Sequence, residues 1–159
     1  MAKTRITVES DLGDLVKDML RVAEQFPEVI LEAADAQMEV LSDAIKTNWS
    51  TMINWESESN YVYDSIGYNT DNEETKDDDV VGMAGVFHVD RIASDYRKTD
   101  KDMTAPNLAY WAEFGYTPRG APHQAGVPYM MNAYLTSLAT QESIFADTLS
   151  AAIAKRIKK

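Results

Sequence analysis

The sequence predicts an α+β fold in which N-terminal helices and a long C-terminal helix pack on a small antiparallel β-sheet. Apolar residues recur at three- and four-residue steps near both ends of the chain, which is typical of helices. β-branched and aromatic residues cluster between them, which favours strands. Because 159 residues with 45% hydrophobic content suit one core, we expect a single domain spanning residues 1–159.

Two helices are expected before the first strand. The first covers residues 12–26, where apolar and charged residues alternate with a helical period. Pro27 interrupts this pattern, and proline is tolerated in the first turn of a helix, so a second helix should run from Pro27 or Glu28 to about Met52. Its predicted apolar stripe is Ile30, Ala33, Ala34, Met38, Leu41, Ile45, Trp49 and Met52.

The middle of the chain predicts a β-hairpin with a long acidic tip. Residues 61–68 and 80–89 have strand composition, and the loop at about 69–79 lies between them. A second charged loop is expected at about 91–104. The acidic residues of the tip repel one another and favour contact with water. They are Asp71, Glu73, Glu74, Asp77, Asp78 and Asp79.

The C-terminal part predicts a short helix, a loop and a long helix. Residues 106–114 are apolar on nearly all sides, so we expect this helix to be buried and Gly115 to cap it. A loop rich in proline and glycine follows, and the last helix should begin at Pro128. Its predicted apolar stripe is Met131, Tyr134, Leu135, Leu138, Ile144 or Phe145, Leu149, Ala152 and Ile153.

The charge balance excludes several functions. The net charge of −11 argues against a surface that grips nucleic acid or anionic lipid. Residues 1–102 hold 10 basic and 23 acidic side chains, whereas residues 103–159 hold 5 and 3, so the charge is uneven. The absence of cysteine excludes disulfides and thiol chemistry, and no apolar run reaches the roughly 18 residues of a membrane span. We expect a soluble protein without membrane contact, assembled in a cytoplasm.

No motif for catalysis, a cofactor or a metal is recognisable. His88 and His123 have no second ligand at a suitable spacing, and neither a nucleophile elbow nor a phosphate-binding glycine loop occurs. The acidic run lacks the glycine and final glutamate of a calcium loop, which leaves an ion site as a minor alternative to a solvated tip. Glu113 lies among aromatic residues, and we expect it to pair with an arginine such as Arg119.

One arrangement in the C-terminal half resembles a known family. Ala-Tyr-Trp-Ala-Glu-Phe-Gly at residues 109–115, a Pro-Arg-Gly-Ala-Pro loop, and Val-Pro-Tyr-Met-Met-Asn-Ala at 127–133 are similar to motifs of the neck or tail-completion proteins of long-tailed bacteriophages. Tyr110 stands one position later than the family's tyrosine, and Tyr129 replaces its usual phenylalanine. The order of helices and strands upstream is similar too. The acidic tip and the 91–104 loop depart from the pattern.

The resemblance implies a structural virion protein and no catalysis. Such a protein forms a ring of six or twelve copies at the head–tail joint, seals it and leaves a channel through which the genome DNA passes without specific binding. Its expected partners are connector or head-completion proteins and a tail terminator or tail tube protein. The motif residues expected in the core are Tyr110, Trp111, Glu113, Phe114, Gly115, Pro128 and Tyr129.

Subunit and partner contacts are expected from the loops and the basic C-terminus. The candidates are the six acidic residues of the tip together with Arg91, Arg97, Lys98, Tyr116, Arg119, His123, Lys155 and Arg156. Within the virion, a tail terminator capping the tail tube is an alternative. From other classes, an acidic inhibitor that mimics DNA and an enzyme that uses Glu113 stay open.

Overall fold

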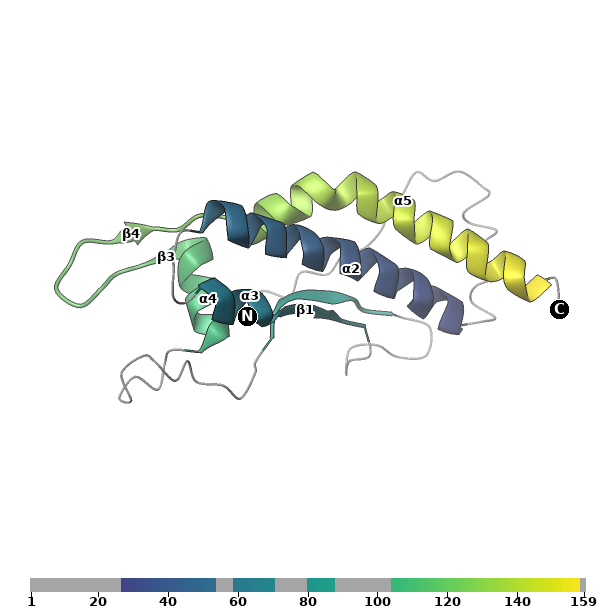
Figure 1. Cartoon of the computed structure of the whole chain (residues 1–159), viewed down its shortest axis with the longest axis horizontal. Coiled ribbons are helices and arrows are strands. Elements are labelled where there is room, and N and C mark those ends of the chain that lie inside the picture. The colour runs from purple at the N-terminus through teal and green to yellow at the C-terminus, as the bar shows by residue number, and fades with distance from the viewer. Residues whose placement is uncertain (1–26, 54–58, 71–79, 88–103, 158–159) are drawn as a thin grey trace.

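The computed structural model describes residues 27–53, 59–70, 80–87 and 104–157 (Figure 1). These residues form an α+β fold with a small antiparallel hairpin and a long C-terminal helix, as the sequence predicts. The expected helix at 12–26, the acidic tip at 71–79 and most of the 91–104 loop lie outside the described residues.

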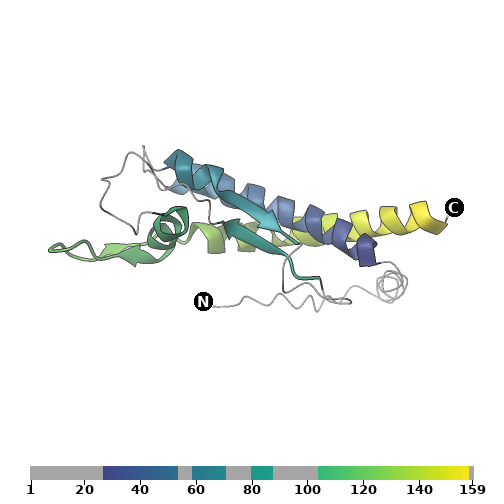
Figure 2. The same ribbon diagram turned by 90° about the horizontal axis from the view of Figure 1, so that it is seen from below.

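Two long antiparallel helices form the body of the molecule. Helix α2 (Pro27–Met52) and helix α5 (Tyr129–Ile157) lie side by side along most of their length (Figures 1 and 2). The start of α2 therefore lies near the end of α5, where Arg156 Nη1 is 2.6 Å from Glu28 Oε1. The predicted bounds of α2 are confirmed.

The body has two apolar clusters. At one end, Val29 and Ala33 of α2 pack with Leu149, Ala152 and Ile153 of α5. At the other end, a larger cluster gathers the second half of α2, the start of α5 and the shorter elements. Its buried members are Met38, Leu41, Ile45, Trp49, Ile53, Val62, Ile66, Ala105, Leu108, Ala109, Ala112, Tyr129 and Ala133. The α2 stripe is thus largely confirmed, except that it ends on buried Ile53, whereas Met52 is exposed.

The hairpin is confirmed, but both of its strands are shorter than predicted. Strand β1 (Ile66–Asn69) pairs antiparallel with β2 (Met83–Val86), with Ile66 opposite Val86. The prediction of a strand from residue 61 is wrong, because α3 (Ser59–Asp64) occupies that segment. A helical turn buries Val62 completely in the larger cluster, and this tertiary contact overrides the strand preference of a Tyr-Val-Tyr sequence.

The first half of the predicted apolar stripe of the last helix is only partly right, since Tyr134 packs against the larger cluster but Met131 and Leu135 do not. Met131 and Leu135 are 55% and 60% exposed, and the buried line of α5 instead follows residues four apart: Tyr129, Ala133, Ser137 and Gln141. Small Ala and Ser side chains on this line favour close approach of the two helices. The second half of the stripe is confirmed, since Leu149, Ala152 and Ile153 are buried.

Candidate assembly interface

Helix α4 (Ala105–Phe114) is joined to the start of α5 by a buried carboxylate. Glu113 Oε2 accepts a hydrogen bond of 2.8 Å from the backbone N–H of Met130, and Oε1 accepts one of 3.2 Å from Met131. The first N–H groups of a helix have no partner within the helix, and its N-terminus carries a partial positive charge. The carboxylate of Glu113, on α4, accepts from two of these N–H groups of α5 and places a negative charge at its N-terminus. The expected pairing with Arg119 is therefore wrong, and Arg119 is exposed.

Two glycines allow the chain to close this junction. Gly115 ends α4 with a φ of 83°, a conformation that favours glycine, and its N–H bonds to the Trp111 carbonyl, which confirms its predicted capping role. A Cβ on Gly126 would overlap backbone atoms of Glu113 and Gly115. The Val127 N–H also donates a 2.7 Å hydrogen bond to the Ala112 carbonyl, so the two segments are held backbone to backbone.

Tyr129 anchors the junction to the body. Its fully buried ring meets Trp49 of α2 edge to face at 5.0 Å between centroids, and its carbonyl accepts a hydrogen bond from Asn48 Nδ2. Its hydroxyl is buried without a hydrogen-bond partner. Burial raises the pKa of this hydroxyl well above its usual value, and the nearby charge of Glu113 raises it further.

An arm, residues 115–125, projects from the junction beyond the ends of the two long helices (Figures 1 and 2). At its base, β3 (Gly115–Tyr116) pairs with β4 (Gln124–Ala125). The Tyr116 ring stacks on the Trp111 ring, with 5.7 Å between their centroids. Thr117 Oγ1 and His123 Nδ1 share a 3.2 Å hydrogen bond across the arm. The arm has its own pairing and turn, although sequence reasoning predicted only a loop.

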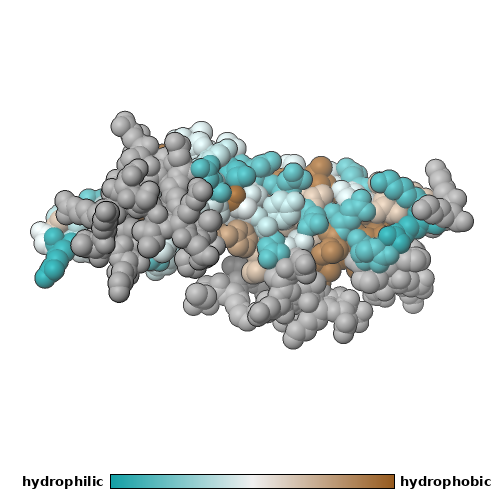
Figure 3. All heavy atoms as spheres, turned by 60° about the horizontal axis from the view of Figure 1, so that its bottom comes forward, coloured by the Kyte–Doolittle hydropathy of each residue, from teal (hydrophilic) through white to brown (hydrophobic). Residues whose placement is uncertain are grey.

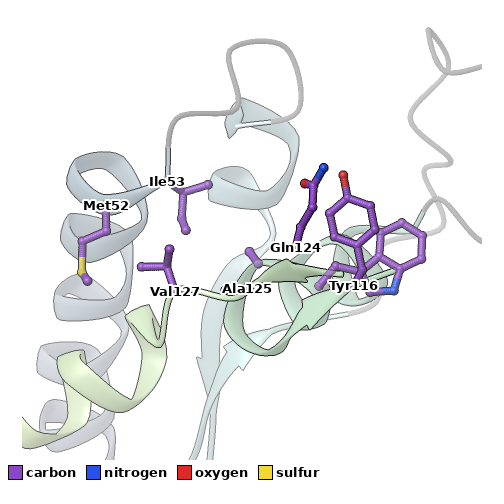
Figure 4. A pocket seen from close by; sticks show the side chains of 8 residues that line it. Met52, Ile53, Tyr116, Gln124, Ala125 and Val127 are labelled. Carbon is purple, nitrogen blue, oxygen red and sulfur yellow. The ribbon is translucent and has the colours of Figure 1, made fainter. Parts of the chain in front are cut away.

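A shallow pocket of about 160 Å³ lies between the base of the arm and the end of α2 (Figure 4). Met52 and Ile53 line one side, and Tyr116, Gln124 and Val127 line the other. No histidine, carboxylate or cation lines it. Its walls offer apolar contact rather than acid–base chemistry.

Four large apolar side chains at the junction are exposed, and we call them the apolar junction surface. Tyr110 and Phe114 on α4 are 60% and 64% exposed, and the centroids of their rings are 4.8 Å apart. Met131 and Leu135 stand one turn apart on α5. Exposed apolar side chains of this size are candidates for contact with another protein.

The motif residues expected in the core divide into two groups. Glu113 and Tyr129 are buried, and Gly115 and Trp111 are half-buried, the latter against Tyr116. Tyr110, Phe114 and Pro128 are exposed, so their expected core positions are wrong. Only one side of α4 faces the body, through Ala105, Leu108, Ala109 and Ala112.

The structure describes five of the predicted contact residues. Tyr116 is half-buried at the arm base, and Arg119 and His123 are exposed on the arm. Lys155 and Arg156 are exposed at the far end of the body, where Arg156 pairs with Glu28. Asp71, Glu73, Glu74, Asp77, Asp78, Asp79, Arg91, Arg97 and Lys98 lie outside the described residues.

Sequence reasoning missed the capping role of Glu113 and the exposure of Met131 and Leu135. A signal for the cap existed, because α5 begins after Val127 and Pro128, neither of which has a side chain that can accept from the helix N–H groups. A helix without a local cap implies a remote acceptor, and Glu113 is the only carboxylate between residues 103 and 141.

The described residues show no arrangement typical of a metal centre or a membrane span. Among them, no three histidine or carboxylate side chains come together as potential metal ligands. No helix in the described ranges combines the length and apolar character needed to cross a bilayer. The chemistry that the described surface offers is apolar contact at the junction and charge on the arm and helices.

Comparisons with protein-family models, with curated proteins and with solved structures found no match for this chain.

Proposed function

We propose that the protein is a structural subunit of a bacteriophage virion, which forms a ring at the head–tail joint and leaves a channel for DNA. The proposal joins the motif resemblance at residues 109–115 and 127–133 to the surfaces described above. In this role the chain performs no catalysis and needs no cofactor. A tail terminator at the end of the tail tube is the nearest variant of the same role.

The apolar junction surface is the observation that carries the proposal. Tyr110, Phe114, Met131 and Leu135 are each more than half exposed, and they lie on α4 and α5, the two helices that the arm connects. Exposing them to water costs free energy, which burial against another protein recovers. A subunit that functions only within an assembly accounts for both features.

The motif residues fit this role in physical terms. Glu113, Gly115, Gly126 and Tyr129 fix the angle between α4, the arm and α5 through hydrogen bonds and close backbone contact. A rigid junction keeps the arm and the apolar surface in one geometry, as repeated identical contacts around a ring require. In this role the motif residues hold the arm and the apolar junction surface in position and do not form a binding pocket.

The test is addition of the purified protein to particles of the phage that encodes it. Heads filled with DNA and free tails are incubated with wild-type protein, and the joint is imaged by electron microscopy. We expect an added ring at the head connector or at the upper end of the tail. Absence of added density on both kinds of particle, with a folded protein, contradicts the proposal.

A further inference from the structure

The arm has a charge character opposite to that of the rest of the molecule. From Phe114 to Gln141 the sequence contains no carboxylate, whereas the whole chain has a net charge of −11. Arg119 and His123 are exposed on the arm. The arm is therefore a neutral to basic projection on an acidic protein, and acidic surfaces attract it.

Part of the body presents a row of carboxylates, which we call the acidic strip. Glu32, Asp35, Glu39 and Asp43 follow one another at three- and four-residue steps along α2, so they share one face of the helix. Glu32, Glu39 and Asp43 are exposed. Within the described ranges, none of these three pairs with a cation.

Strand β1 brings a tyrosine to this strip. Strand β1 packs against α2, on which the strip lies, and the negative charges of Glu39, Asp35 and Asp43 add to the effect of burial in raising the pKa of the Tyr68 hydroxyl. The Thr70 hydroxyl donates a hydrogen bond to Asp35. Tyr68 is 39% exposed, and the register of the hairpin places it on the same face as Ala84. The surface thus combines carboxylates with apolar groups, and Figure 3 shows hydrophilic areas next to smaller hydrophobic ones on the side of β1 and β2.

We infer that the arm of one copy docks on the acidic strip of the next copy. Arg119 then faces Glu39 and Asp43, while the uncharged part of the arm covers Tyr68. This inference rests on the proposed ring and names one of the contacts between its neighbouring copies. Charge complementarity selects a second copy as the occupant, since one chain carries both halves of the contact.

The two halves also have the geometry that a ring needs. The arm leaves the molecule at one end, beyond α2 and α5, whereas the strip lies along α2. A contact between two different surfaces is heterologous, and it repeats from copy to copy, giving a ring where the rotation closes and a filament where it does not. The arm keeps its shape before docking because β3 and β4, the Tyr116–Trp111 stack and the Thr117–His123 bond hold it.

Cysteine cross-linking tests the contact directly, since the chain has no cysteine of its own. Ala121→Cys on the arm is mixed with Glu39→Cys on the strip and oxidised at low protein concentration. The matched control mixes Ala121→Cys with Ser143→Cys, an exposed position on α5. We expect about ten times more mixed disulfide with Glu39→Cys than with the control, as a specific contact raises the local thiol concentration.

Charge reversal gives a second readout at the same positions. Arg119→Glu and Glu39→Arg should each weaken self-association by about tenfold, since each places like charges in the contact. A chain carrying both changes restores opposite charges and should recover most of the lost affinity. Equal self-association of all four proteins overturns the docking.

The outcomes separate the docking from the proposed function. Rings that form without preferred Ala121–Glu39 cross-linking overturn the docking and leave the ring intact. Preferred cross-linking without a closed ring, or without addition to phage particles, supports the docking and contradicts the function. A third outcome is that the wild-type protein binds DNA, that Arg119→Glu does not, and that no preferred cross-link forms. This outcome shows that the arm binds nucleic acid and overturns the inference.

Discussion

Glu113 Oε2 lies 2.8 Å from the backbone nitrogen of Met130, and this bond fastens α4 to the first turn of α5. The carboxylate caps a helix that has no capping side chain of its own. Because the arm leaves the molecule between these two helices, the bond also fixes the direction of the arm. A residue that sequence reasoning treats as one half of an ion pair or as a candidate acid is a structural cap.

Replacing Glu113 by Gln should lower the free energy of unfolding by about 1–2 kcal/mol. The amide keeps one acceptor but turns an NH₂ group toward a second backbone N–H, and it loses the attraction to the helix N-terminus. Urea unfolding followed by circular dichroism measures the change. Glu142→Gln is the control, because Glu142 is exposed on α5, the helix that Glu113 caps, and it should change stability by less than about 0.5 kcal/mol. Equal values for the two variants would contradict the capping role.

Gly126→Ala should destabilise the protein by about 2 kcal/mol or more, because the added methyl group overlaps backbone atoms of Glu113 and Gly115. Backbone atoms cannot turn aside as a flexible side chain does. Gly85→Ala is the matched control, since no atom lies within 4 Å of its added Cβ. Thermal unfolding of both variants checks the prediction, and a smaller loss for Gly126→Ala than for Gly85→Ala would refute the close approach.

Stability should fall more steeply at alkaline pH in the wild type than in Tyr129→Phe. The pKa of Tyr129 is raised in the folded state by burial, so above about pH 10 the unfolded chain loses this proton while the folded chain keeps it. Ionisation then favours the unfolded state, and stability declines as pH rises. Below that pH both states hold the proton, and Tyr129→Phe should be neutral or slightly stabilising because it removes a buried hydroxyl without a partner.

Urea titrations at pH 8 and pH 11 measure this difference. Tyr110→Phe is the control, because Tyr110 is largely exposed and lies on the apolar junction surface. The same pH dependence in Tyr129→Phe and in the wild type would show that the Tyr129 hydroxyl reaches water.

The double substitution Phe114→Ser and Leu135→Ser should abolish self-association and leave folding almost unchanged. Both side chains are about 60% exposed, so truncating them removes little core packing. Sedimentation velocity and urea unfolding measure the two properties on one preparation. Thr136→Ala and Thr140→Ala, exposed on α5, together form the control. Undiminished association of the serine variant would remove this surface from the assembly.

The sequence predicts the long helices and the hairpin well because their signals are local. Pro27 marks the start of α2, and the apolar stripe from Ala33 to Trp49 repeats without interruption. Segment 59–64 is different, since its strand composition competes with the burial of Val62, and only the assembled core decides between them.

The junction could be predicted only in part. Gly115 is recognisable as a helix cap, but the hydrophobic residues at 110, 114, 131 and 135 have the composition of a core. Periodicity identifies an apolar face without saying whether the chain itself or another protein covers it. In α5 the chain covers the line of Ala133, Ser137 and Gln141 and leaves Met131 and Leu135 outside, and composition cannot distinguish these two faces.

The central claim is that this protein assembles into a ring, and its mass in solution tests that claim most directly. Light scattering of the purified full chain over a range of protein and salt concentrations, with negative-stain imaging of large species, gives the mass and shape together. The account predicts a closed ring of six or twelve copies, formed in solution or when phage heads or tails are added. A protein that stays monomeric under all these conditions contradicts it.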